Sequence, residues 1–158
     1  MAGDRSASPI DELRDLALSA PPAEFGIQPE VGRAWAVVMD TTYPEGSVSL
    51  IALSDGSASL YRSTGGGMIG GQGRENVARA AQAFVNEATR HLLRFTTAVA
   101  TGLPPPGITR FYVRTEAGTV TAEATEADLG AGNHPLSPLF YAGHEVITQF
   151  RAVTDAGK

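Results

Sequence analysis

The chain has 158 residues, of which 42% are hydrophobic and 18% are charged, and this size and composition indicate one globular domain. It has no cysteine, so disulfides, thiol nucleophiles and cysteine zinc sites are excluded. Its only lysine is Lys158, so no internal lysine is present for a P-loop or a Schiff base.

Charge and hydropathy also limit the partners that the chain is expected to bind. The net charge of −5 disfavours broad binding to nucleic acid. No apolar run approaches the ~18–20 residues that span a bilayer, and the segment MAGDRSASPIDELRD is too polar for a signal peptide. We therefore expect a cytoplasmic protein whose partner is neither a membrane nor a nucleic acid.

A short helix is the first predicted element, and it begins at Ser8 and Pro9. Serine is a favoured N-cap, proline suits the first helical position, and acidic residues follow in the first turn. The pair Pro21-Pro22 ends the helix, whose modest apolar stripe predicts packing on the edge of the domain or on a partner. We divide the chain into an N-terminal helix with its connecting segment (1–30), a single α+β domain (31–154) and a tail (155–158).

Three strands follow and form a meander. The continuous apolar run RAWAVVMD (33–40) suits a buried strand, and VSLIALS (48–54) is the second strand. Asp55-Gly56 is a strong hairpin signal, because this pair tolerates the positive φ angles of a tight turn. SASLYRS (57–63) is therefore predicted to be the third strand, antiparallel to the second.

A long amphipathic helix is predicted over residues 75–100. Its apolar residues, from Val77 to Val99, recur with a period near ~3.6 and fall within one arc. The opposite side is a candidate contact surface, because an exposed leucine lies there among arginines. This side carries Arg79, Arg90, Leu93 and Arg94.

The C-terminal part predicts a hairpin at 108–125, a loop at 126–138 and a final helix from Ser137-Pro138. Consecutive hairpins favour an antiparallel sheet. The expected fold class is α+β, with a five-stranded, mainly antiparallel sheet (three-strand meander, long helix, hairpin), a long central helix, a C-terminal helix and a short N-terminal helix. In size and content it is similar to small α+β folds of the profilin or roadblock kind, although the strands are distributed differently around the central helix.

The segment RSTGGGMIGGQGREN (62–76) holds six glycines in fifteen positions, between the third strand and the long helix. GGGMIG (65–70) satisfies the GxGxxG pattern. The strands before it are antiparallel, however, and the position of the acidic ribose partner falls inside the long helix, so a dinucleotide fold is excluded. A P-loop is excluded because its lysine is missing.

RSTGGG (62–67) resembles the R/Q-x-x-G-x-G pattern with which acetyltransferases of the GNAT family hold the pyrophosphate of acetyl-CoA. The resemblance implies an anion site where glycine amides and a helix N-terminus face the phosphates. Two departures are the seven residues MIGGQGR before the helix and the absence of a helix between the next two strands. The residues of such a site are Arg62, Gly65, Gly67, Gly70, Gly71, Gly73 and Arg74.

The other interpretation of this segment is a flexible loop that exposes Met68 and Ile69 and binds no ligand. We favour this loop, and with it a non-enzymatic interaction module without a cofactor that self-associates as a homodimer or binds another protein. The alternative is a protein that binds CoA or another anionic ligand, such as a GNAT-like acyltransferase. The contact residues expected for the interaction module are Met68, Ile69, Arg79, Arg90, Leu93 and Arg94.

The three histidines indicate neither a metal site nor a catalytic base. His91 borders the apolar arc of the long helix, and His134 and His144 lie ten residues apart, a spacing that matches no standard metal motif. The chain also lacks the GxSxG nucleophile elbow. We therefore assign no catalytic and no metal-ligating residue.

Overall fold

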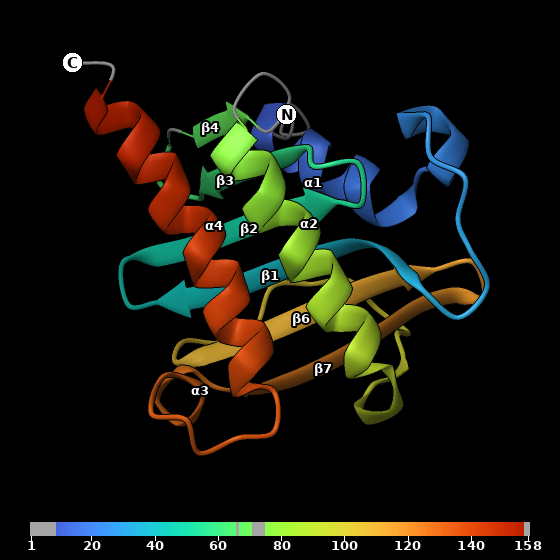
Figure 1. Ribbon diagram of the computed structural model, residues 1–158. Coiled ribbons are helices and arrows are strands. Elements are labelled where there is room, and N and C mark those ends of the chain that lie inside the picture. The colour runs from blue at the N-terminus through green and yellow to red at the C-terminus, as the bar shows by residue number, and fades with distance from the viewer. Residues whose placement is uncertain (1–8, 66, 71–74, 157–158) are drawn as a thin grey trace, which may run out of the picture.

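One antiparallel sheet organises the chain (Figure 1). The structure is a computed structural model that describes residues 9–65, 67–70 and 75–156. Within these residues seven strands pair in the order β4-β3-β2-β1-β6-β7-β5, and every pair of neighbours is antiparallel. The α+β class and the antiparallel sheet predicted from the sequence are confirmed.

The strands in chain order are β1 (Ala34–Tyr43), β2 (Gly46–Leu53), β3 (Ala58–Arg62), β4 (Gly67–Gly70), β5 (Thr96–Thr97), β6 (Ile108–Thr115) and β7 (Gly118–Thr125). The α-helices are α1 (Pro9–Ser19), α2 (Glu75–Arg90), α3 (Glu126–Gly130) and α4 (Ser137–Ala156), and the short 3-10 helices are η2 (Pro22–Phe25) and η3 (Leu92–Arg94).

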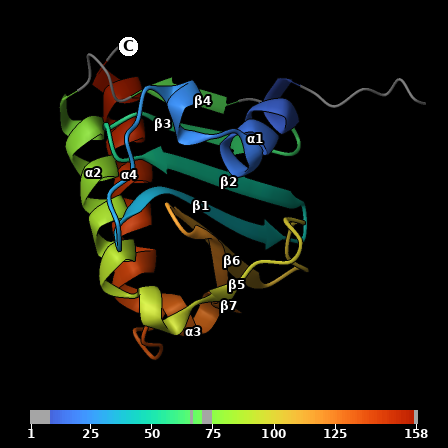
Figure 2. The same ribbon diagram turned by 90° about the vertical axis from the view of Figure 1, so that its right-hand side faces the viewer.

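The two faces of the sheet are covered by different elements, as Figure 2 shows. Helices α2 and α4 lie side by side on one face. Helix α1 and residues 98–106, which we call the strap, lie on the other face. Strand β1 is therefore enclosed on both faces, and its residues from Ala34 to Thr41 are all buried. This double burial is the reason that the strand has a continuous apolar sequence and not an alternating one.

The larger core lies between the sheet and the pair α2 and α4. It contains Val37 and Met39 of β1, Phe84 of α2 and Val146 of α4, all at most 3% exposed. The close approach of α4 depends on Gly143. A Cβ atom there would lie 2.9 Å from both Cε and Sδ of Met39 and 3.1 Å from Cε1 of Phe84.

The smaller core lies on the opposite face and brings α1 into the fold. Leu18 of α1 packs in one cluster with Trp35, Val38, Ile51 and other buried residues of the sheet. Helix α1 thus covers a sheet face of its own chain, whereas its sequence predicted packing at the edge of the domain or on a partner. The narrow apolar stripe of α1 is wide enough because the helix covers only part of this sheet face. The strap covers the rest.

A buried ion pair fastens α1 to the centre of the sheet. Asp40 of β1 is fully buried, and its Oδ2 accepts from Nη2 of Arg14 at 2.6 Å while its Oδ1 accepts from Ser49 Oγ at 2.6 Å. Arg14 Nη2 also donates to the Thr101 carbonyl of the strap at 2.8 Å. Burial by itself lowers the pKa of Arg14, but the hydrogen bond and charge of Asp40 outweigh it and raise that pKa above its ordinary value.

The C-terminal end of α1 is held by a second arginine. Arg114 of β6 donates to the carbonyls of Ala17 and Ala20, which the helix itself leaves without partners. Its guanidinium lies 4.5 Å from the centre of the Trp35 ring, in cation–π contact. Arg14 and Arg114 therefore fix two points of α1 on the sheet.

The long helix is shorter than predicted. Helix α2 ends at Arg90, because the chain turns there to bury Phe95 in the larger core and to pair Thr96–Thr97 with β7. β-branched threonines favour this strand pairing over helix. Val99, which the periodicity placed on the buried arc, is 98% exposed.

The predicted loop at 126–138 contains the short helix α3. Thr125 caps it, since its Oγ1 accepts from the Asp128 amide at 3.1 Å. Glu126 and Asp128 in the first turn favour the same start through the helix dipole. The predicted count of five strands is also corrected, because the described residues add β4 and β5 to the five expected strands.

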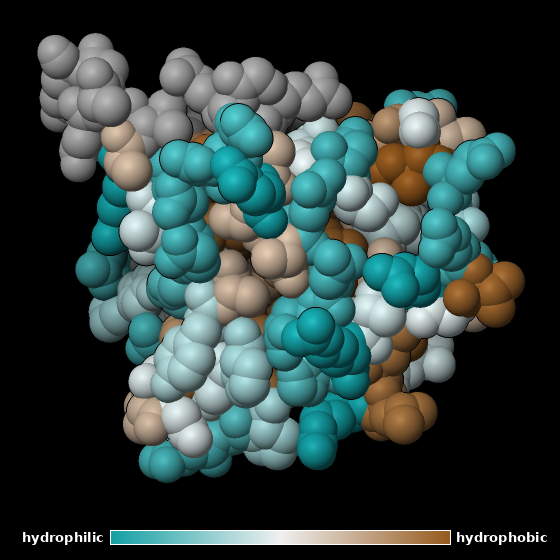
Figure 3. All heavy atoms as spheres, in the orientation of Figure 1, coloured by the Kyte–Doolittle hydropathy of each residue, from teal (hydrophilic) through white to brown (hydrophobic). Residues whose placement is uncertain are grey.

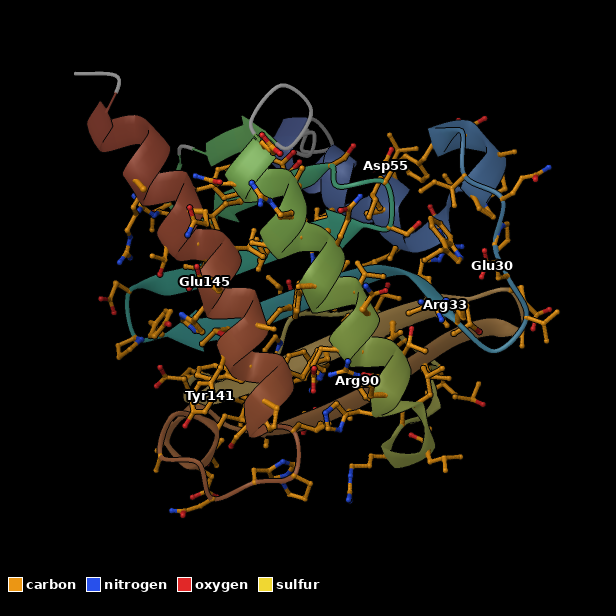
Figure 4. The ribbon with its side chains drawn as sticks, viewed as in Figure 1. Glu30, Arg33, Asp55, Arg90, Tyr141 and Glu145 are labelled. Carbon is orange, nitrogen blue, oxygen red and sulfur yellow. The ribbon has the colours of Figure 1, made fainter. Side chains whose placement is uncertain are left out.

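We predict that Arg14→Met lowers the free energy of unfolding by about 3–5 kcal/mol, because it leaves the Asp40 carboxylate buried without its partner. Arg33→Met is the matched control: its ion pair with Glu30 is exposed (Figure 4) and is worth less than about 1 kcal/mol. Urea denaturation of both variants measures the difference. An equal decrease in the free energy of unfolding in both variants would show that the buried ion pair stabilises the protein no more than the exposed one.

The packing of α4 predicts a second stability difference. Gly143→Ala should cost about 1–3 kcal/mol, because the new methyl group overlaps Met39 and Phe84. Gly130→Ala is the control, since its nearest contact would be the Phe140 ring at 3.8 Å. Thermal unfolding that ranks the two variants in the opposite order would contradict the close contact.

Candidate functional site

The described part of the glycine-rich segment forms a β-hairpin with β3. The Gly65 amide donates to the Arg62 carbonyl at 3.0 Å in a turn that needs the positive φ of Gly65, +115°. Residues 67–70 then pair with β3 as β4, so they do not cap the start of α2. Gly71, Gly73 and Arg74 lie outside the described residues. The anion site expected on these glycines and arginines stays a prediction.

Met68 and Ile69 lie in a strand, which corrects the prediction of a loop at these positions. In the register of the hairpin, Met68 is opposite Leu60 and Ile69 is opposite Ser59. Glycine is depleted in strands, so the two glycines that bound this segment concealed it in the sequence. Strand β4 stands first in the strand order and pairs only with β3 among the described residues.

The predicted arginine side is continuous along α2 but does not extend past its end. Arg79 contacts Glu75 and Arg90 contacts Glu87, each within α2, and eleven residues of helix separate them by ~16 Å. Arg94 lies beyond the end of α2, in η3. Leu93 is fully exposed, as its position among arginines predicted. Figure 3 shows exposed hydrophobic atoms at the lower right, where the chain leaves α2.

The two groups of predicted contact residues lie at opposite edges of the sheet. Met68 and Ile69 belong to β4, and Leu93 immediately precedes β5 at the other end of the strand order. At ~4.8 Å between neighbouring strands, the two edges are roughly 25–30 Å apart. A contact surface that includes both groups would have to span the full width of the sheet.

A pocket of about 570 Å³ opens between the start of the strap and strands β6 and β7. Arg110 and Tyr112 of β6 are paired with Glu123 and Thr121 of β7, and all four line the pocket. Tyr112 belongs to the smaller core, so the pocket lies on the same face as α1. Arg94 and Val99 form part of its rim. Except for Arg94, sequence reasoning missed these residues as site residues.

Polar contacts of the strap fix the shape of this pocket. Tyr112 donates its hydroxyl to the Gly102 carbonyl at 2.6 Å, and Arg110 Nη1 donates to the same carbonyl at 3.1 Å. Arg110 Nε donates to Glu123 Oε1 at 2.6 Å. Burial lowers the pKa of Arg110 and the bond to Glu123 raises it, with a net rise. The alternation Arg110, Tyr112, Arg114 in the sequence was the available signal that one face of β6 is polar.

Each of the three histidines contacts a different partner. His91 Nε2 lies 2.9 Å from Glu87 Oε2, and His134 Nδ1 accepts from the Leu136 amide at 3.0 Å. His144 packs on the Phe140 ring at 4.4 Å between ring centres. The part of the chain that the structure describes contains no group of three or more histidine, aspartate and glutamate residues that could hold a metal ion.

Fold and pocket together define a small α+β protein with two long helices on one face of an antiparallel sheet and a ligand-sized pocket on the other. Comparison with protein-family models, with curated proteins and with solved structures gives no match. Among the described helices, none has both the length and the hydropathy needed to cross a membrane.

His144 predicts a pH dependence of stability. Burial lowers its pKa below the ordinary 6.5, more than the nearby Glu126 raises it, and Arg151 lowers it further. The unfolded chain therefore binds the proton more tightly, so stability should fall as the pH drops through 6.5 toward the lowered pKa. Urea denaturation between about pH 5 and pH 7.5 should show a smaller fall for His144→Gln. An identical fall in both proteins would rule out His144 as its source.

Proposed function

We propose that this protein is a non-enzymatic interaction module that forms a homodimer by pairing β4 of one copy with β4 of another. The observation that carries the proposal is the outermost strand of the sheet, Gly67–Gly70, which contains no charged residue and pairs on one side only among the described residues. An edge strand of this kind presents unpaired N–H and C=O groups to another strand. Edge pairing is a common mode of association.

The opposite edge supports the choice of β4 by contrast. Strand β5 covers only Val120 and Thr121 of β7, and the remaining edge carries the charged Glu123, half exposed. Charged residues and very short edge strands are the usual means by which proteins prevent strand pairing. The β7 edge carries a charged residue beside the two-residue β5, whereas the four residues GMIG of β4 include no charge.

Antiparallel pairing at the β4 edge favours a second copy of the same chain as the partner. Two identical strands that pair antiparallel are related by a twofold axis, so one segment supplies both halves of the contact. Because GMIG contains no charged residue, two copies of this strand pair without like-charge repulsion. Met68 and Ile69 therefore remain the proposed contact residues. They would make the contact as part of an edge strand and not as part of an exposed loop.

The alternative function, binding of acetyl-CoA at the glycine-rich segment, has less support. Its pattern needs free amides at the start of a helix, but residues 67–70 pair with β3. Leu93 offers a second possible contact, at the other edge of the sheet. Since the two edges lie far apart, variants can separate them.

Sedimentation equilibrium over a range of concentrations tests the proposal. Met68→Lys and Ile69→Lys place a charge on the edge at two successive positions of β4, and each should raise the dissociation constant of the dimer by about tenfold or more. Leu93→Glu is the matched control and should leave it unchanged. Unaltered melting temperatures would confirm that the variants fold.

Two results would contradict the proposal. One is a wild-type protein that stays monomeric at the highest concentration reached. The other is a dimer that Leu93→Glu dissociates while both lysine variants leave it intact, which would place the interface at the end of α2.

A further inference from the structure

We propose that the pocket between the strap and strands β6 and β7 binds a small carboxylate with an apolar body. This inference does not depend on the pairing of β4, because the pocket lies at the opposite end of the strand order. Its volume, about 570 Å³, falls within the range of about 300–1,000 Å³ that is typical of small-molecule sites.

The charge of the pocket favours a single negative group. Arg94 and Arg110 bring two positive charges and Glu123 one negative charge, so the lining carries a net charge of +1. The guanidinium of Arg94 forms no ion pair or hydrogen bond with another described residue, so it is available to a ligand. Arginine is the side chain best suited to a carboxylate, since it can donate two parallel hydrogen bonds.

Arg110 adds a fixed set of donors. Its bonds to Glu123 and to the Gly102 carbonyl use two of its five N–H groups and hold the guanidinium in place. A further hydrogen bond to the Tyr112 side chain leaves at most two N–H groups for a ligand. A donor that is already oriented loses little conformational entropy on binding, so Arg110 favours the ligand more than a mobile arginine would.

The rest of the lining favours an apolar body for the ligand. Val99 is 98% exposed at the rim, and the neighbouring Ala100 lines the pocket beside it. Covering the exposed Val99 side chain removes apolar area from water, which stabilises the complex. Glu123 already pairs with Arg110, so Arg94 is the lining charge left without a described partner, and one carboxylate suffices to match it.

Isothermal titration calorimetry with 3-phenylpropanoate and its uncharged amide tests the proposal. The acid should bind the wild-type protein saturably, and the amide should bind at least about tenfold more weakly, because it lacks the charge that the arginines recognise. Succinate should also bind more weakly than 3-phenylpropanoate, because it has a second carboxylate in place of the apolar body that covers Val99.

Two matched variants locate the site. Arg94→Gln should raise the dissociation constant of 3-phenylpropanoate by about tenfold or more, through loss of a charge-assisted hydrogen bond. Arg90→Gln removes an arginine of similar exposure that lies outside the pocket lining, and should leave binding unchanged.

Three outcomes would overturn the proposal. They are equal binding of acid and amide, absence of saturable binding by the wild-type protein, and equal effects of the two arginine variants. None of them bears on the dimer, whose failure sedimentation would show separately. Val99→Ser gives a further readout, since it should weaken binding of the acid without changing its preference over the amide.

Discussion

The ion pair between Arg14 and Asp40 is the interaction on which the second face of the molecule depends. Asp40 lies in the middle of the central strand and is fully buried, so its carboxylate needs a partner. Arg14 comes from α1 and also holds the Thr101 carbonyl of the strap. One guanidinium therefore joins the helix, the sheet and the strap. The position of the strap, and with it the shape of the pocket, depends on the bond from Arg14 to Thr101 and on the bonds of Tyr112 and Arg110 to the Gly102 carbonyl.

Local signals predicted much of the fold. The continuous apolar run of β1 and the Asp55-Gly56 turn each correspond to an element close to its predicted range, and α2 begins where its period predicted, because each of these signals depends on residues adjacent in the chain. The end of α2 was missed, since the burial of Phe95 and the pairing of β5 involve a strand more than twenty residues away. Strand β4 was missed because glycine carries little strand propensity.

The pocket could not be derived from the sequence, because its lining residues come from segments that are distant in the chain. Arg94 and Glu123 are far apart in the chain and meet only because β5 and β6 both pair with β7. The buried pair Arg14–Asp40 likewise joins residues 26 positions apart. Leu93 is exposed as predicted, although it lies in η3 beyond the end of the helix whose period suggested it. Contacts between distant segments can be predicted only when the order of the strands in the sheet is known, and a single sequence does not give that order.

The two edges of the sheet have different chemistry, and this difference separates the two proposed activities. The β4 edge is uncharged and offers backbone groups to a second strand, whereas the β7 edge carries Glu123 and borders the cationic pocket. A dimer formed through β4 leaves the pocket of each copy open. It also closes on its own twofold axis, so it does not extend into a filament.

Hydrogen–deuterium exchange at different protein concentrations tests the pairing of β4 most directly. If β4 pairs with β4 of a second copy, exchange at the amides of Gly67–Gly70 should slow as the concentration rises through the dissociation constant of the dimer, while exchange near Leu93 stays the same. Exchange at β4 that is independent of concentration, in a sample that sedimentation shows to be dimeric, would contradict the account.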